Sequence, residues 1–272
     1  MKRTVFFLSD STGITAETLG HALLTQFDNL DCRQVTIPFV RDIARAEEAV
    51  EEIDQAGQRD GERPVVFSTL TNSAIYDTVC RAEALVMDLF SVFLGPLEVE
   101  FNRGSTHAAG RFHGLIDRAS YDVRIEAVDF TLKHDDGAYL KGYDSADIIL
   151  VGVSRSGKTP TCVYMSMQFG IRAANYPLVD EDLASGRLPE PLRDYRDRLF
   201  GLTIDAERLR QIRAERRPDS RYSSLSQCRK EVVEVETLLR REGVPFLNTS
   251  RSSVEEIATS VLHQTGLKRR RF

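Results

Sequence analysis

The chain has 272 residues, of which 28% are charged and 42% are hydrophobic. With 17 glycines and 9 prolines it has the composition of a folded globular protein, which excludes a disordered or collagen-like chain. The net charge of −5 argues against a nucleic-acid-binding protein, and no apolar stretch approaches the roughly 18 residues that a membrane span needs.

The N-terminal part of the chain alternates strand and helix patterns. Short apolar runs predict strands at residues 4–8, 34–40, 64–69 and 84–87. Helices are predicted at residues 16–27 and after two candidate capping residues, Asp42 and Asn72. This alternation predicts a parallel sheet with helices on both faces. The first apolar run ends at Asp10, too early for a signal peptide, so we expect a cytoplasmic protein.

The alternation stops between residues 101 and 143 and then resumes. Charged and apolar residues alternate at 124–130, which fits either a half-exposed strand or the edge of a helix. Beyond this break the patterns predict strands at 146–151, 198–204 and 244–247, and helices at 205–215, 226–241 and 253–265. We therefore predict an α/β protein with an N-terminal parallel-sheet domain (1–104), a bridging segment (105–144) and a P-loop kinase-like α/β domain (145–272).

A phosphate-binding motif follows the strand predicted at 146–151. The sequence Gly152-Val153-Ser154-Arg155-Ser156-Gly157-Lys158-Thr159 matches G-x-x-x-x-G-K-[ST] at every fixed position. Its glycines let the backbone bend so that several N–H groups converge on phosphate oxygens, at a helix N-terminus of positive dipole character. The lysine can reach the terminal phosphates, and the threonine hydroxyl can bind Mg²⁺. The motif predicts nucleotide or phosphate binding.

The general base and the remaining metal ligands are less visible. His134-Asp135-Asp136-Gly137 offers a histidine and two carboxylates, but Asp-Gly is also an ordinary β-turn, which the residue types alone favour. Asp88 follows a predicted strand in the wrong half of the chain, and Asp147 stands at the wrong end of its strand.

Weaker candidates have simple structural interpretations. Residues 9–13 (Ser-Asp-Ser-Thr-Gly) could bind an anion, although helix capping is the safer interpretation. His107 and His113 lack an adjacent third ligand, so no metal site is predicted there. The arginines after the motif could clamp phosphate, and the basic tail 268–272 could bind anions. Solvated surfaces nevertheless explain most such clusters. The arginines concerned are Arg193, Arg196, Arg198, Arg213, Arg216 and Arg217.

Taken together, these motifs resemble the pyruvate, phosphate dikinase regulatory protein family over nearly the whole chain. The resemblance rests on residues 9–13, on 134–137, on 146–155 with Lys158-Thr159-Pro160, and on Ala174-Asn175-Tyr176-Pro177-Leu178. Many relatives carry Thr-Ser before the lysine, where this chain has Ser156-Gly157. That difference brings the chain nearer to the general P-loop pattern.

The resemblance implies a bifunctional enzyme that acts on phosphoenolpyruvate synthase. One activity would transfer phosphate from ADP to a threonine of the synthase and inactivate it. The other would use inorganic phosphate to remove the group, giving pyrophosphate. Lys158 and Arg155 would then stabilise the moving phosphoryl group, and His134 with Asp135 or Asp136 would supply the base or bind metal.

Other possibilities stay open at this stage. The motif alone is also compatible with an ATP-dependent small-molecule or nucleotide kinase, or with a non-catalytic regulator that senses a nucleotide. The oligomeric state is not determined by the sequence, and a homodimer is one expectation.

Overall fold

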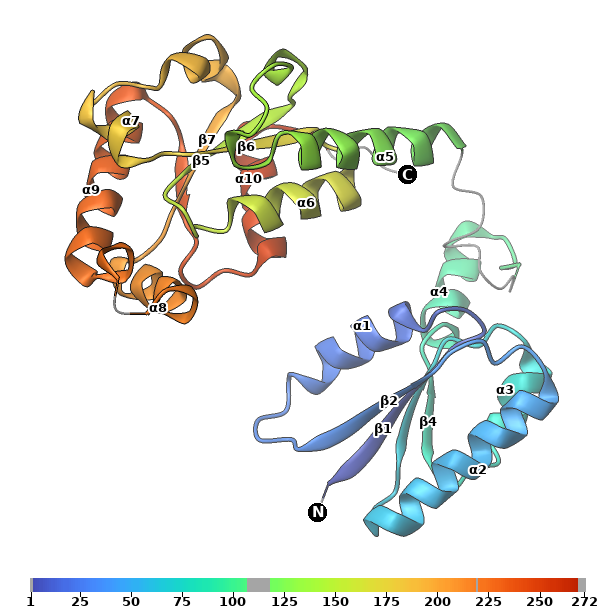
Figure 1. Ribbon diagram of the computed structural model, residues 1–272. Coiled ribbons are helices and arrows are strands. Elements are labelled where there is room, and N and C mark those ends of the chain that lie inside the picture. The colour runs from blue at the N-terminus through green and yellow to red at the C-terminus, as the bar shows by residue number, and fades with distance from the viewer. Residues whose placement is uncertain (1, 107–117, 219, 269–272) are drawn as a thin grey trace. The chain divides into compact units, whose positions relative to one another are not determined.

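The computed structural model describes residues 2–106, 118–218 and 220–268 (Figure 1). The chain divides into two compact units, Met1–Leu115 and Ile116–Phe272. Each unit is built on a four-stranded parallel sheet covered by helices, which confirms the predicted α/β class. No helix of the described ranges is long and apolar enough to cross a membrane.

The sheet of the first unit has the strand order β2-β1-β3-β4, with every pair parallel. Its strands are β1 (Arg3–Leu8), β2 (Cys32–Ile37), β3 (Val65–Ser68) and β4 (Leu85–Asp88), and its helices are α1 (Ile14–Leu24), α2 (Ile43–Asp60), α3 (Ser73–Val79) and α4 (Ser91–Phe101). Side chains alternate along β1, so Phe6 and Leu8 pack under α2 and α3 while Val5 and Phe7 pack under α1.

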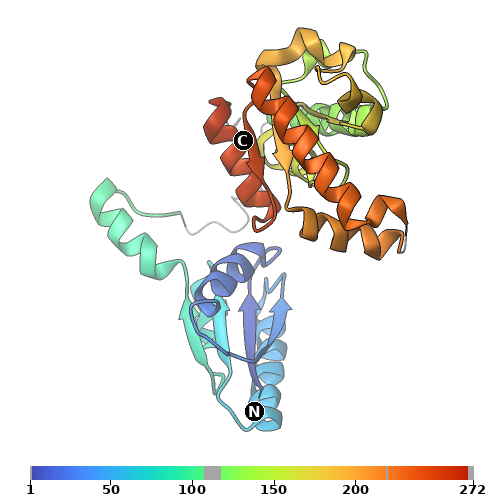
Figure 2. The ribbon, with the colours of Figure 1, turned by 90° about the vertical axis from the view of Figure 1, so that its left-hand side faces the viewer.

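Local sequence accounts for the ends of these helices. Asp42 and Asn72 cap α2 and α3 as predicted, because each side chain accepts a hydrogen bond from a main-chain N–H of the first turn. The helix α4 was not predicted. It has no buried residue and extends away from the sheet (Figure 2).

The sheet of the second unit has the order β6-β5-β7-β8, which repeats the order of the first sheet. Its strands are β5 (Ile148–Gly152), β6 (Ala173–Pro177), β7 (Leu199–Thr203) and β8 (Phe246–Asn248). Its helices are α5 (Arg118–Lys133), α6 (Lys158–Phe169), α7 (Asp180–Ala184), α8 (Ala206–Arg216), α9 (Leu225–Glu242) and α10 (Val254–Thr265), with short 3₁₀ turns η1 (Asp135–Gly137), η2 (Tyr143–Ser145), η3 (Glu190–Arg198) and η4 (Arg221–Ser223).

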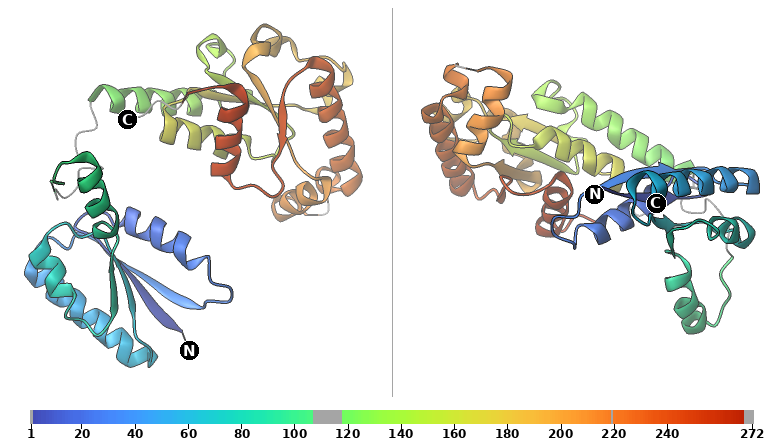
Figure 3. Two further views of the ribbon diagram at one scale, coloured as in Figure 1. Left: turned by 180° about the vertical axis from the view of Figure 1, so that it is seen from behind. Right: turned by 90° about the horizontal axis from the view of Figure 1, so that it is seen from below.

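Two apolar layers enclose this second sheet. Ile148 and Leu150 pack with residues of α6 and α10, whereas Ile149 and Val151 pack with residues of α9. Figure 3 shows helices on both faces of this sheet. The alternating pattern at 124–130 forms part of the helix α5. Helix α5 packs on α6, and η1 packs on β6, so this part of the expected bridging segment belongs to the second unit.

Candidate active site

The loop at residues 153–157 joins β5 to α6 at the carboxyl edge of the second sheet, as the motif predicts. Gly152 has a φ of 152°, and a Cβ there would lie 2.0 Å from the carbonyl oxygen of Leu202. Gly157, with a φ of 91°, precedes the first residue of α6. The residue types of the motif are therefore required by the backbone, which has the strand–loop–helix arrangement of an anion-binding nest.

Lys158 lies inside this loop, with only 4% of its surface exposed. Its Nζ donates to the carbonyl oxygens of Gly152 (3.2 Å) and Val153 (2.9 Å). Burial lowers the pKa of Lys158 to about 8, although the nearby charges of Asp136 and Asp135 favour the protonated form. An anion bound in the loop would add a further negative charge and favour the ammonium form.

The next residue, Thr159, contacts the predicted carboxylate cluster. Its hydroxyl donates to Asp135 Oδ1 at 2.7 Å, and Asn175 Nδ2 donates to the same oxygen. Asn175 is fully buried in β6, where it pairs in register with Leu150 of β5. Its amide oxygen accepts from the main-chain N–H of Asp136 at 3.1 Å. One buried side chain thus fixes both aspartates beside the first turn of α6.

Asp136 occupies the exposed side of this turn. Its φ of 50° is left-handed, a conformation that aspartate tolerates better than most residues. Among the described residues, its carboxylate has no hydrogen-bond partner, whereas that of Asp135 has two donors. Asp135 and Asp136 thus lie in a 3₁₀ turn, as their residue types favour, and this turn stands next to the phosphate loop.

The ring of His134, by contrast, is part of the core. It is 4% exposed and stacks on Phe130 with ring centres 3.9 Å apart. Nδ1 lies 2.7 Å from the carbonyl oxygen of Phe130, and Nε2 lies 3.1 Å from that of Lys141. Both nitrogens face main-chain acceptors, so this geometry leaves neither of them for a substrate. We therefore place His134 among the residues that support the turn.

The arginines of the expected phosphate clamp are dispersed. Arg198 Nη1 donates to the carbonyl oxygen of Ala146 at 2.9 Å, and Arg196 pairs with Glu242 at 2.5 Å. Both arginines precede β7, at the amino edge of the sheet and opposite the phosphate loop. The expectation that Arg213 lies on a solvated helix face is wrong, because its side chain is buried and only 1% exposed. Arg155 is exposed on the loop with a φ of 77°.

The motif at residues 9–13 leads into α1 and supplies its N-cap residue. Gly13, with a φ of 85°, is the N-cap of α1 and has no side-chain cap bond. The buried Asp10 carboxylate instead accepts from the N–H and hydroxyl of Thr71, at 3.1 and 2.7 Å. The Asp88 carboxylate accepts from the N–H groups of Phe90 and Ser91, at 2.9 and 3.1 Å, where the chain enters α4. These acidic side chains thus have structural partners within the first unit.

No cluster of three or more histidine, cysteine, aspartate or glutamate side chains suited to a metal occurs in the part of the chain that the structure describes. His107 and His113 lie outside the described residues, as does most of the basic tail. The oxygens of Thr159 and Asp135 are hard donors of the kind that Mg²⁺ takes together with substrate phosphates, so this pair fits Mg²⁺.

Comparison with known proteins decides the family. The family model described as "Kinase/pyrophosphorylase" matches residues 5–262 of this chain. The chain belongs to the kinase/pyrophosphorylase family. It is similar to proteins named "Putative phosphoenolpyruvate synthase regulatory protein" from Legionella pneumophila (strain Corby), Marinobacter nauticus and Hahella chejuensis. The identities are 55%, 52% and 50%, and 99–100% of each chain is covered.

Of two buried polar residues beside this candidate site, Asn175 carried a signal that the sequence interpretation did not use, whereas Arg213 carried none. Asn175 interrupts a run of apolar residues in β6, and a buried amide in a central position needs polar partners. Arg213 lies in the arginine-rich helix α8, and in the sequence it cannot be told apart from the other arginines of that helix. Spacing alone does not distinguish a buried arginine from a solvated one.

Proposed function

We propose that this chain is a bifunctional regulator of phosphoenolpyruvate synthase. As a kinase it transfers the terminal phosphoryl group of ADP to a threonine hydroxyl of the synthase, which forms the threonine O–P bond and releases AMP. As a phosphorylase it transfers that phosphoryl group from the threonine to inorganic phosphate, which restores the hydroxyl and releases pyrophosphate. The family match and the names of the similar proteins support the target, and the phosphate loop supports the chemistry.

The phosphate loop supplies positive charge at the transferred group. Phosphoryl transfer needs mainly positioning and charge stabilisation, because its transition state spreads negative charge over the phosphoryl oxygens. Lys158 is held at the loop by the carbonyl oxygens of Gly152 and Val153, and it can exchange these partners for phosphate oxygens. Arg155, exposed on the same loop, adds a second cation at its open side.

Thr159 and Asp135 would hold Mg²⁺. Their two oxygens already lie 2.7 Å apart, and the Asp135 carboxylate is fixed by Asn175. When bound, Mg²⁺ neutralises charge on the phosphate oxygens of ADP or inorganic phosphate.

Asp136 is the candidate general base for the target threonine. Its carboxylate is exposed and has no hydrogen-bond partner among the described residues, and its charge acts on the buried Lys158 of the loop. It can accept the threonine proton during the kinase reaction and return it during the phosphorylase reaction. The carboxylate of Asp135 is already used by two donors, so the two aspartates divide the tasks.

The contact of Thr159 and Asp135 beside Lys158 carries this proposal, and a transfer assay tests it. The full chain is incubated with ADP labelled in the β-phosphate and with synthase phosphorylated on its catalytic histidine, the form of the target that the family resemblance implies. The synthase is then examined by intact-mass and peptide mass spectrometry. We expect label on one threonine with the wild type and none with Lys158→Ala. Label from γ-labelled ATP instead would indicate an ATP-dependent kinase, and inhibition without a mass change would indicate a non-catalytic regulator.

A further inference from the structure

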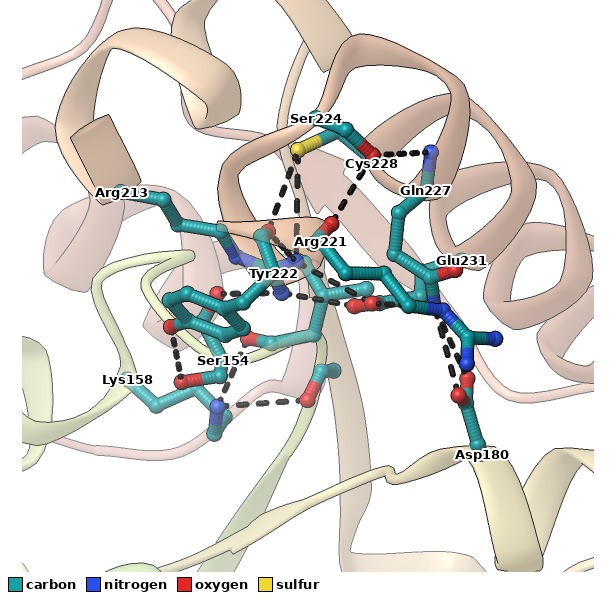
Figure 4. Close-up of polar contacts among 12 residues, drawn as sticks. Ser154, Lys158, Asp180, Arg213, Arg221, Tyr222, Ser224, Gln227, Cys228 and Glu231 are labelled. Carbon is teal, nitrogen blue, oxygen red and sulfur yellow. Dashed lines mark hydrogen bonds and ion pairs between the residues drawn. The ribbon is translucent and has the colours of Figure 1, made fainter. Parts of the chain in front are cut away.

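Two side chains from outside the phosphate loop hold Ser154, which lies within it. The carbonyl oxygen of Ser154 accepts a hydrogen bond from Arg213 Nη2 at 3.2 Å, and its hydroxyl lies 3.2 Å from the hydroxyl of Tyr222 (Figure 4). Arg213 comes from α8 and Tyr222 from η4, so residues distant in sequence fix this point of the loop.

Arg213 is held in place by a complete set of partners at its terminal nitrogens. Nη1 and Nη2 lie 3.1 and 2.6 Å from the two carboxylate oxygens of Glu231, on α9. Nη1 also donates to the carbonyl oxygen of Tyr222 at 3.1 Å, and the guanidinium carbon stands 4.1 Å from the centre of the Tyr222 ring. Together with the bond to Ser154, all four terminal N–H groups are directed at acceptors.

A second layer supports Glu231. Gln227 Nε2, one turn earlier on α9, donates to Glu231 Oε1 at 2.9 Å and lies 3.3 Å from both carboxylate oxygens of Asp180. Asp180 is the first residue of α7, which follows β6 (Figure 4). The network therefore runs from the first residue of α7 through α9 and α8 to the phosphate loop.

Stability alone does not account for this buried pair. Moving an arginine and a glutamate out of water has a large desolvation cost, and apolar residues of similar volume are often as stable or more so. Arg213 Nε, moreover, has no partner among the described residues, which adds to that cost. The bond from Arg213 to the loop carbonyl is the feature that an apolar replacement would not reproduce.

The geometry of the peptide bond gives this contact a function. In a trans peptide the C=O of one residue and the N–H of the next point in opposite directions. When Arg213 fixes the Ser154 carbonyl oxygen, it also fixes the N–H of Arg155, directed away from Arg213. We propose that Arg213 is a positioning residue that aims the Arg155 N–H at bound phosphate, with Glu231 holding the guanidinium; this rests on the proposed function of the loop.

A matched pair of double variants of the full chain tests this role. Arg213→Met with Glu231→Leu removes both charges, so that no unpaired buried charge remains. Arg196→Met with Glu242→Leu removes an ion pair to the same helix α9 at the amino edge of the sheet. Isothermal titration with inorganic phosphate and with ADP measures the affinity of each variant, and thermal unfolding shows whether each variant is folded. The ¹⁵N–¹H signal of the Arg155 main-chain amide reports whether that N–H contacts phosphate.

We expect the Arg213/Glu231 variant to stay folded and to bind inorganic phosphate about tenfold more weakly, as for one lost charge-assisted hydrogen bond. Its Arg155 amide signal should no longer shift on addition of phosphate, whereas the Arg196/Glu242 variant should behave like the wild type. Wild-type affinity in the folded Arg213/Glu231 variant would overturn the inference.

A conservative variant decides the case if that double variant fails to fold. Glu231→Gln keeps the volume of the side chain and weakens its hydrogen bonds with Arg213. We expect this variant to bind phosphate several-fold more weakly. Wild-type affinity in this variant would also overturn the inference. A wild-type chain that binds neither ADP nor phosphate would overturn the proposed function, and the inference with it.

Discussion

The Thr159 hydroxyl donates a 2.7 Å hydrogen bond to the Asp135 carboxylate, from the first turn of α6 to a turn 24 residues earlier in the chain. This bond joins two motifs that are separate in the sequence. It places a hydroxyl and a carboxylate beside Lys158, and leaves Asp136 exposed next to them.

The two aspartates should differ in what their loss changes. Asp136→Asn removes the proposed base, so we expect kcat to fall by roughly 10²–10⁴ in both directions while the Mg²⁺ requirement stays unchanged. Asp135→Asn should instead raise the Mg²⁺ concentration needed for half-maximal rate. Steady-state kinetics over a Mg²⁺ series separates the two effects. Equal Mg²⁺ dependence in the two variants would contradict this division of tasks.

Lys158 should make stability depend on pH. Its folded-state pKa of about 8 lies below the ordinary value of 10.5, so between these values the unfolded chain binds more protons than the folded chain. The contribution of Lys158 to the free energy of unfolding therefore rises with pH across this window, by about 3 kcal/mol. Urea unfolding of the wild type and Lys158→Met tests it. We expect the wild type to gain stability relative to the variant as the pH rises through this window, and an identical pH dependence in both proteins would be inconsistent with a buried lysine.

Asn175 should matter to both stability and metal use. Asn175→Ala leaves the N–H of Asp136 without its acceptor and Asp135 without one donor, and we expect a loss of roughly 1–3 kcal/mol in the free energy of unfolding. The Mg²⁺ requirement should rise as well, because Asp135 is less well held. Denaturant unfolding and the same Mg²⁺ series measure the two effects. An unaltered Mg²⁺ requirement would show that Asn175 acts on the fold alone.

Gly152 should be irreplaceable for a steric reason. Gly152→Ala would place Cβ 2.0 Å from the carbonyl oxygen of Leu202, whereas Gly243→Ala, also at a left-handed φ, meets open space. We expect the control to cost about 1 kcal/mol and Gly152→Ala to cost more than about 3 kcal/mol or to prevent folding. Thermal unfolding of the two variants provides the comparison, and equal midpoints would argue against the close approach at Gly152.

Patterns with a local physical cause were predictable from the sequence. The caps Asp42 and Asn72 and the phosphate loop after an apolar strand depend on residues near one another in the chain. Features that depend on distant partners were not. β6 was missed because Asn175 and Pro177 interrupt its apolar character, and its register with β5 becomes visible only in the folded sheet.

The candidate site was only partly predictable, because it too depends on contacts between residues distant in the sequence. The sequence identified His134, Asp135 and Asp136 as one group, but their roles depend on contacts. Only the fold shows that the His134 ring nitrogens face Phe130 and Lys141 while Asp135 faces Thr159. The common strand order of the two sheets also escaped detection, because buried strands can share an arrangement with little sequence in common.

The central claim is that one phosphate loop, in the second unit, serves both reactions. Its most direct test gives threonine-phosphorylated synthase and ³²P-labelled inorganic phosphate to the wild type and to Lys158→Ala, and measures labelled pyrophosphate, with the ADP-dependent reaction measured in parallel. We predict that Lys158→Ala loses both reactions by a similar factor, of at least roughly 10², while its circular-dichroism spectrum stays unchanged. Loss of only one reaction in the folded variant would contradict a shared site.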